Sequence, residues 1–185
     1  MTDTTSGTVD WTVQLLDQLD WHWTRQLRPR FAGLTDDEYL WEPARPAWNV
    51  RPRRTADEPG VGPFTVDFAY PEPDPPPVTT IAWRMAHIIV GVFNARTASH
   101  FGGPPADYAT WQFAMSADEA LKQLDDAYEA WMAGARTADL SKAVGPAEGP
   151  FAAEPMATLV LHINREVIHH AAEIALLRDL YLRES

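Results

Sequence analysis

Apolar residues recur at helical intervals in four long stretches of this chain. In the first stretch, about residues 8–31, they are spaced three or four positions apart, which places them on one face of an amphipathic helix. Pro29 should bend or end the last turn, and Gly33 stops the helix. The predicted buried face of this helix comprises Val13, Leu16, Leu19, Trp23, Leu27 and Phe31.

Three more long helices follow. The second spans about residues 79–101 and ends at the Gly-Gly-Pro-Pro motif of residues 102–105. The third begins at the capping box Ser-Ala-Asp-Glu of residues 116–119 and runs to about residue 135. The fourth spans about residues 155–182. The core stripe predicted for the third helix is Leu121, Leu124, Tyr128, Trp131 and Met132.

The stretch between the first and second helices has a different character. The capping box Thr-Asp-Asp-Glu of residues 35–38 opens a short helix through Trp41, and ten prolines then exclude a long helix from residues 43–78. Four aromatic residues suggest an ordered crossover that can cover a pocket, because a free linker would not need them. Its segment 64–70 can pair as a short strand. The aromatic residues are Trp48, Phe64, Phe68 and Tyr70.

These elements predict an all-α fold, a four-helix bundle with a long proline-rich crossover loop between helices 1 and 2. No convincing run of alternating strand residues argues for a sheet. The length of 185 residues fits a single helical domain over residues 1–185.

The composition narrows the function classes. The chain has no cysteine, which excludes disulfides, thiolate metal sites and cysteine nucleophiles. Its net charge of −11 argues against nucleic acid as a partner, because such binding depends on neutralising phosphates. The N-terminal sequence lacks the basic start and apolar run of a signal peptide, and no apolar stretch approaches the roughly 20 residues of a membrane helix. We therefore expect a soluble, cytoplasmic protein with no membrane partner.

Arginines gather in the crossover despite the acidic composition. An exposed loop of this kind is expected to carry them as a solvated group that balances acidic neighbours. The four arginines are Arg45, Arg51, Arg53 and Arg54.

A row of ionisable side chains runs along the fourth helix. Its members follow at intervals of four, four and three, and therefore share one face: His162, Glu166, His170 and Glu173. Apolar residues on the same side predict that this row turns inward. A histidine and a glutamate four residues apart can bind one metal ion inside a bundle. The alternatives are a surface ladder of Glu–His pairs and a buried hydrogen-bond network without metal.

The remaining histidines point to chemistry less directly. His87 interrupts an apolar stretch of the second helix, where a histidine is often simply hydrogen-bonded in the core. His169 can face either side of the fourth helix, and His22 is expected to pack against an aromatic edge. His100 stands at a helix end, where a cation suits the helix dipole, and is assigned no chemistry. Arg178 is expected to face solvent or pair with a nearby acid.

Three segments of the chain resemble a known family. They are GLTDDEYLW at residues 33–41, WRMAHI at residues 83–88 and NREVIHHAAE at residues 164–173. Together they resemble the DinB/YfiT-like superfamily over nearly the whole length, and the second and third segments are the more specific. The resemblance implies a four-helix bundle with a metal site at one end.

The resemblance also implies a set of ligands. Family members typically hold the metal with one histidine of the second helix and two histidines four residues apart on the last. These positions are His87, Glu166 and His170 here, so a carboxylate replaces one imidazole. A site with two histidines and one carboxylate can still take zinc, nickel, iron or manganese. Glu173 stands where the family often has a glutamine and is a candidate partner for His170.

Characterised relatives include transferases and isomerases that use low-molecular-weight thiols such as mycothiol or bacillithiol. By resemblance, we expect a metal-dependent enzyme that transfers such a thiol onto an electrophilic small molecule. Arg84, Arg96 or the crossover arginines could hold an acidic thiol.

Glu166 in place of a histidine favours an alternative. In that alternative, the chain is a non-catalytic binding or dimerisation module whose metal site is degenerate. The family resemblance implies a homodimer in either case.

Overall fold

The computed structural model describes residues 8–184. Residues 1–7, on which the expectation about a signal peptide rests, lie outside the described residues. The first helix is built from α1 (Trp11–His22), a π-helical turn η1 (Trp23–Leu27) and α2 (Arg28–Arg30). It begins later than the predicted residue 8, because the Asp10 carboxylate accepts the backbone N–H of Val13 and caps the helix there.

The second helix contains α4 (Ile81–Ala86), the π-helical stretch η2 (His87–Asn94) and α5 (Ala95–Phe101). The Thr80 hydroxyl caps its start by accepting the backbone N–H of Trp83. In η2 the backbone widens: the Ala95 N–H bonds to the carbonyl of Val90, five residues earlier. Gly102 ends the helix in the left-handed conformation, with φ 74°, as the Gly-Gly-Pro-Pro motif predicts.

The remaining long helices are α6 (Ala117–Ala135) and α7 (Met156–Glu184), joined through a 3₁₀ turn η3 (Pro146–Phe151). The Ser116 hydroxyl accepts the backbone N–H of Glu119, so the predicted capping of the third helix is confirmed. The predicted bounds of these helices agree with the structure to within two residues at each end.

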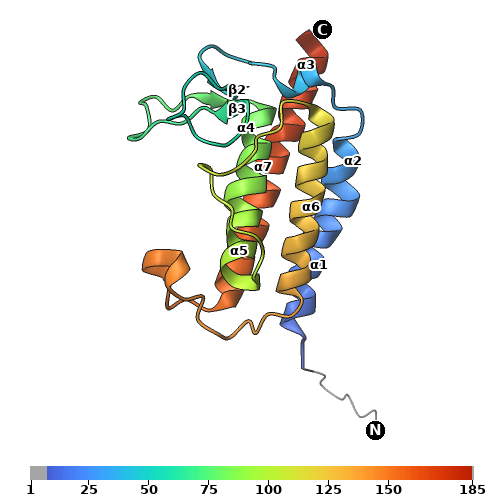
Figure 1. The fold of residues 1–185 in the computed structure, drawn as a ribbon. Helices are drawn as coiled ribbons and strands as arrows, with labels where there is room; N and C mark the ends of the chain where they lie inside the picture. The colour runs from blue at the N-terminus through green and yellow to red at the C-terminus, as the bar shows by residue number, and fades with distance from the viewer. Residues whose placement is uncertain (1–7, 185) are drawn as a thin grey trace.

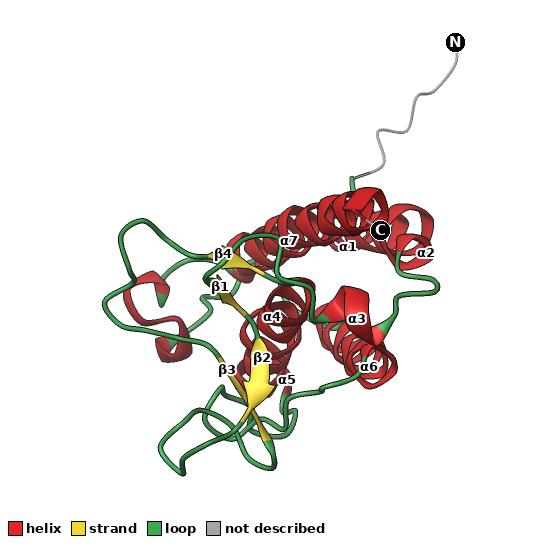
Figure 2. Ribbon diagram, turned by 90° about the horizontal axis from the view of Figure 1, so that it is seen from above, coloured by secondary structure: helices red, strands yellow, loops and turns green. Residues whose placement is uncertain are grey.

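The four helices pack as a bundle in which the first and fourth run in one direction and the second and third in the other (Figure 1). The second and third helices can run the same way because the segment 102–116 returns along the bundle before α6 begins. The crossover and the η3 turn both project from the side where α4 and α7 adjoin (Figure 2). This side carries the candidate site.

The crossover contains two small sheets, so the all-α prediction holds only for the bundle. β1 (Ala47–Trp48) pairs in parallel with β4 (Val78–Thr79), and β2 (Val50–Pro52) pairs antiparallel with β3 (Phe64–Val66). The strand pairing anticipated near residues 64–70 is therefore found at residues 64–66. The sheets supply partners for backbone groups that this stretch, lacking a helix, cannot satisfy within itself.

The predicted buried faces are largely confirmed. All five residues of the third-helix stripe are buried, and so are five of the six in the first helix. Val13 is the exception: it lies in the first turn of α1 and is 55% exposed. Within residues 8–184, no helix is both long and apolar enough to cross a membrane.

A buried ion pair ties α7 to the short helix α3 (Asp36–Tyr39). Arg178 donates two hydrogen bonds to the Glu38 carboxylate, at 2.5 and 3.1 Å, and these residues are 9% and 2% exposed. Arg178 also donates to the carbonyl of Ala32, at 3.1 Å. The Thr35 hydroxyl caps α3 as predicted, but the Glu38 side chain turns to Arg178.

Candidate metal centre

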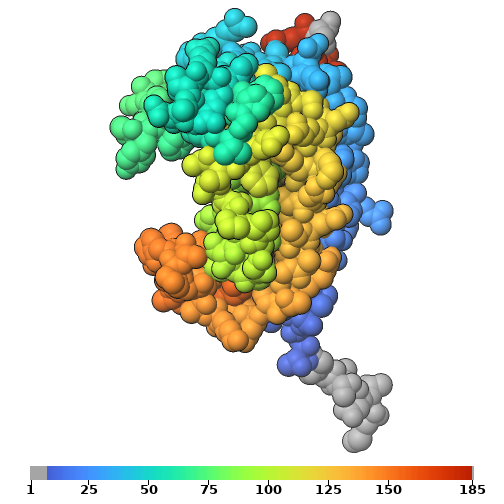
Figure 3. Space-filling model, in the orientation of Figure 1, coloured from blue at the N-terminus to red at the C-terminus, as the bar shows by residue number. Residues whose placement is uncertain are grey.

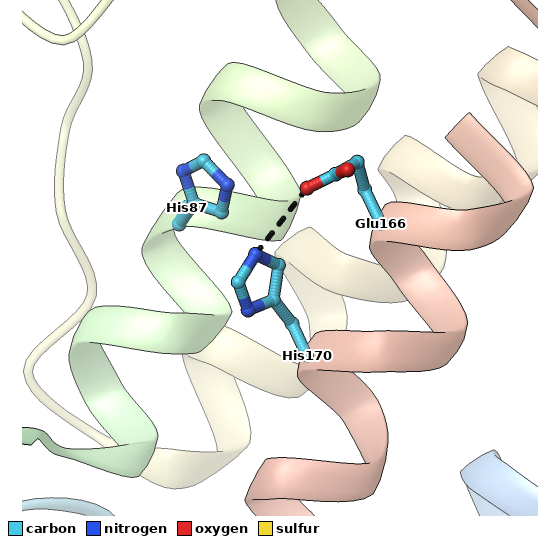
Figure 4. A group of neighbouring side chains, drawn as sticks. All are labelled: His87, Glu166 and His170. Carbon is cyan, nitrogen blue, oxygen red and sulfur yellow. Dashed lines mark ion pairs between the residues drawn. The ribbon is translucent and has the colours of Figure 1, made fainter. Parts of the chain in front are cut away.

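His87, Glu166 and His170 lie together where the second helix meets α7 (Figure 4). Each offers one ligand atom, and these atoms all lie within 4.8 Å of one another. Glu166 Oε2 is 3.6 Å from His170 Nε2, and the two imidazole rings meet edge to face at 4.8 Å between centroids. The sequence prediction of these three residues as one group therefore agrees with the geometry.

Glu173 fixes the tautomer of His170. The Nδ1 atom of His170 lies 2.8 Å from Glu173 Oε2, and an ionised carboxylate can only accept a hydrogen bond. The proton therefore resides on Nδ1, which leaves the lone pair of the neutral ring on Nε2, the atom facing Glu166. Arg84 pairs with the same carboxylate and holds it in place. A carboxylate behind a histidine in this way is a common support for a metal ligand.

Tyr108 supports His87 from the segment 102–116. Its hydroxyl lies 2.8 Å from His87 Nδ1, which leaves Nε2 as the ring nitrogen free for an ion. Burial raises the pKa of Tyr108 to about 12, so the phenol keeps its proton at neutral pH. Gly91, one turn after His87, makes this approach possible, because a Cβ there would overlap the Tyr108 hydroxyl.

Both imidazoles are held in the neutral state. Burial lowers the pKa of His87, and the nearby carboxylate of Glu166 only partly offsets this. Burial lowers the pKa of His170 to about 4, and repulsion from His87 and His169 when they are protonated, and from Arg84, adds to the effect. An imidazole binds a metal only in its neutral form. The lowered pKa values therefore reduce the competition between protons and the metal ion for the ring nitrogens.

The donor set fits a divalent transition metal. Two imidazole nitrogens and one carboxylate oxygen suit zinc, nickel, iron or manganese, and they leave coordination positions open. Donor atoms on one ion at about 2.1 Å can be at most about 4.2 Å apart. The ligand atoms all lie within 4.8 Å of one another, and Glu166 Oε2 and His170 Nε2 at 3.6 Å already satisfy this limit.

A sequence comparison decides the family. The family model described as the DinB superfamily matches residues 18–174, most of the chain. This chain belongs to the DinB superfamily. Comparisons with curated proteins and with solved structures gave no significant match.

In this DinB protein, two further histidines stand beside the central group. His162 accepts a hydrogen bond from Arg165 at Nδ1, at 2.6 Å, and the same atom is 3.5 Å from Glu166 Oε1. His169 is exposed and lies 3.5 Å from Glu173 Oε1, so that it forms a second, more open group with His170 and Glu173.

The two other histidines lie elsewhere. His22 is half-buried in a shallow groove with Ala171 and Ala172, and burial lowers its pKa. His100 is almost fully buried, with Nε2 2.8 Å from Glu148 Oε1, so its role at the helix end is to bind the η3 turn.

Two cavities flank the candidate ligands of the DinB protein. One, of about 550 Å³, lies under the crossover and includes His87 and Tyr108 in its wall. The other, of about 490 Å³, lies beside η3 and includes His162, whose ring contacts Glu166. The surface between the crossover and η3 is hollowed (Figure 3).

Sequence reasoning missed two residues of the site. Tyr108 lies in an irregular segment with no periodicity, and nothing in the sequence links it to His87. Gly91 reads as an ordinary helical glycine. The signal that could have drawn attention to it is its position one turn from His87 within an apolar helix.

Proposed function

We propose that this DinB protein is a metal-dependent enzyme that transfers a low-molecular-weight thiol, of the mycothiol type, onto an electrophilic small molecule. The observation that carries the proposal is the convergence of His87, Glu166 and His170, with both imidazoles oriented by other side chains. Side chains that only formed a surface ladder would not need the support of Tyr108 and Glu173.

Each residue has a definite role in this proposal. A bound divalent ion would lower the pKa of a thiol that coordinates it. His87, Glu166 and His170 would hold that ion, while Glu173 with Arg84 and Tyr108 keep the two rings in position. A lone pair of the thiolate sulfur then forms a bond to the electrophilic carbon. The bond between that carbon and its leaving group breaks, and the leaving group keeps the bonding electrons. The thiol proton passes to solvent.

The cavity beside η3 suits an acidic thiol. Arg96 and Arg165 both line it, together with His162. All three arginines near the ligands are engaged by carboxylates: Arg84 by Glu173, Arg96 by Glu148 and Arg165 by Glu166. Arg84 is less suitable than the sequence suggested, because its side chain is the least exposed, 16% against 31% and 70%. The crossover arginine Arg51 is likewise engaged, with Glu42 and Asp67.

Elemental analysis tests the proposal first. Purified, untagged protein is expected to carry close to one equivalent of a divalent metal, whereas the His170→Ala variant carries little. His22→Ala is the matched control, because it removes a half-buried histidine outside the cluster, and it should retain the metal.

Thiol-transfer assays with the retained ion then follow, using mycothiol and bacillithiol. The absence of metal in all three proteins, even after incubation with zinc, nickel and manganese, would rule the proposal out.

The alternative is a non-catalytic module with a degenerate metal site. The observation that favours it is that Glu166, the departure from the family pattern, is already engaged by His162 and Arg165 at 3.5 and 3.4 Å. It predicts that His87→Ala and His170→Ala keep ligand or partner binding. Such partners would include a second copy of the chain, since we expect a homodimer from the family resemblance.

A further inference from the structure

The cavity under the crossover has an unusual lining. It occupies about 550 Å³ between the crossover and the start of the second helix, and it reaches His87. Aromatic side chains dominate its walls, although most of the crossover is polar or proline-rich. The aromatic residues that line it are Trp48, Phe68, Tyr70, Trp83 and Tyr108.

A continuous series of rings leads from the crossover to the candidate metal ligands. Trp48 and Trp83 lie 5.7 Å apart between centroids, and Trp83 stacks on His87 at 5.6 Å with an angle of 11° between the planes. The indole N–H of Trp83 donates to the carbonyl of Asp67 at 2.8 Å, which fixes the ring against the crossover. A flat ligand can therefore stack on a rigid wall that ends at the reaction centre.

The outer rim of this cavity is aromatic but uncovered. Phe68 is 66% exposed and Tyr70 is 90% exposed, so neither ring is needed for the bundle core. The ring centroids of Phe68 and Trp48 lie 6.2 Å apart, so an aromatic ligand at the rim can contact both rings. Large exposed rings beside an apolar cavity are typical of a binding site, because a bound ligand buries them.

The charges around the cavity select against anions. None of the described residues that line it is a lysine or an arginine, and two carry carboxylates, Asp67 and Glu72. Asp67 is neutralised by Arg51 at 2.6 Å. The second cavity differs in this respect, since Arg96 and Arg165 line it together with the carboxylates of Glu148 and Glu154. The two cavities therefore suit chemically different parts of a reaction complex.

We infer that the crossover cavity binds a neutral aromatic ring, and that the electrophile of this enzyme is an uncharged aromatic compound. The assignment of the ring to the electrophile rests on the proposed function. Binding of the ring itself requires only the cavity, so it can be measured in protein stripped of metal.

The test uses 2-naphthalenemethanol as a neutral aromatic probe and naphthalene-2-sulfonate as its anionic counterpart, titrated by calorimetry into EDTA-treated protein. We expect saturable 1:1 binding of the alcohol, and binding of the sulfonate at least tenfold weaker. Phe68→Ala should weaken binding of the alcohol at least fivefold. Phe151→Ala is the control: Phe151 is 65% exposed and lines the other cavity, and its loss should change the affinity less than twofold.

Three results would overturn the inference: no saturable binding of the alcohol, equal losses in the two phenylalanine variants, or tighter binding of the sulfonate. Both variants alter exposed rings, and an unchanged melting temperature verifies that they fold. Metal content is measured separately. Aromatic binding without metal retention would keep the cavity assignment and reject the proposed enzyme, whereas metal retention without aromatic binding would do the reverse.

Discussion

At the scale of single residues, the site depends on hydrogen bonds behind the ligands as much as on the ligands. Both imidazoles use Nδ1 for a protein partner and keep Nε2 for the centre. For His170 the partner is a carboxylate that a sequence can suggest, since Glu173 lies on the same helical face three residues on. For His87 the partner is Tyr108, which chain topology brings from a different segment.

Removing the Tyr108 hydroxyl should therefore weaken metal binding without unfolding the protein. We expect Tyr108→Phe to reduce metal affinity about tenfold, because the ring of His87 loses the contact that orients it. Gly91→Ala should act in the same direction, since its methyl group displaces the Tyr108 hydroxyl. Competition with a chromophoric chelator measures both affinities. Tyr128→Phe, which loses a hydroxyl bond to Asp20 elsewhere, should leave the affinity unchanged, and an equal loss there would contradict this role.

The state of His170 makes the stability of metal-free protein depend on pH. Its pKa is about 4 in the folded chain and about 6.5 in the unfolded chain, so between these values only the unfolded chain binds the proton. The free energy of unfolding must then fall as the pH decreases from 6.5 to 4, by about 3 kcal/mol from this residue. Urea titrations in EDTA should show a shallower decline for His170→Gln. Parallel profiles for parent and variant would contradict the lowered pKa.

At the scale of elements, the sequence predicted the four helices well because their signals are local. Ser116 and Thr35 cap their helices through neighbours three residues away, and the apolar stripes repeat within each helix. The small sheets could not be predicted with the same certainty, because β1 and β4 are two residues each and pair across about thirty residues of chain. The widened turn that begins at His87 has no sequence signal either.

The buried ion pair of Arg178 and Glu38 joins the C-terminal part of α7 to the short helix α3, so the stability of each depends on the other. Arg178→Leu should lower the free energy of unfolding by about 3 kcal/mol, because it leaves the Glu38 carboxylate buried without a partner. Asp179→Asn, the next residue of α7, breaks only an exposed pair with Arg30 and should cost less than about 1 kcal/mol. Chemical denaturation measures both values. Similar losses for the two variants would show that burial does not distinguish the pairs.

At the scale of the whole molecule, the sequence could place the candidate ligands only in part. The spacing of Glu166 and His170 put them on one face of a helix, but joining them to His87 required the family resemblance, since 79 residues separate His87 from Glu166. The cavities lay beyond prediction. Their walls combine helix residues with residues of the crossover, the returning segment 102–116 and the η3 turn, and the positions of these connections follow from tertiary packing rather than from periodicity.

The helices carry the candidate metal ligands and the connections carry much of the cavity wall, and this separation has an evolutionary consequence. The candidate ligands stand on helices anchored in the bundle core, while most of the aromatic wall stands on the crossover, outside that core. Insertions and exchanges in such a connection cost little stability. A lineage could therefore acquire a new substrate by exchanging the exposed rings Phe68 and Tyr70, while Val50 and Val66 of the same stretch stay in the core and the reactive centre stays unchanged. In the laboratory, these exposed positions are the natural target for a library that diversifies specificity.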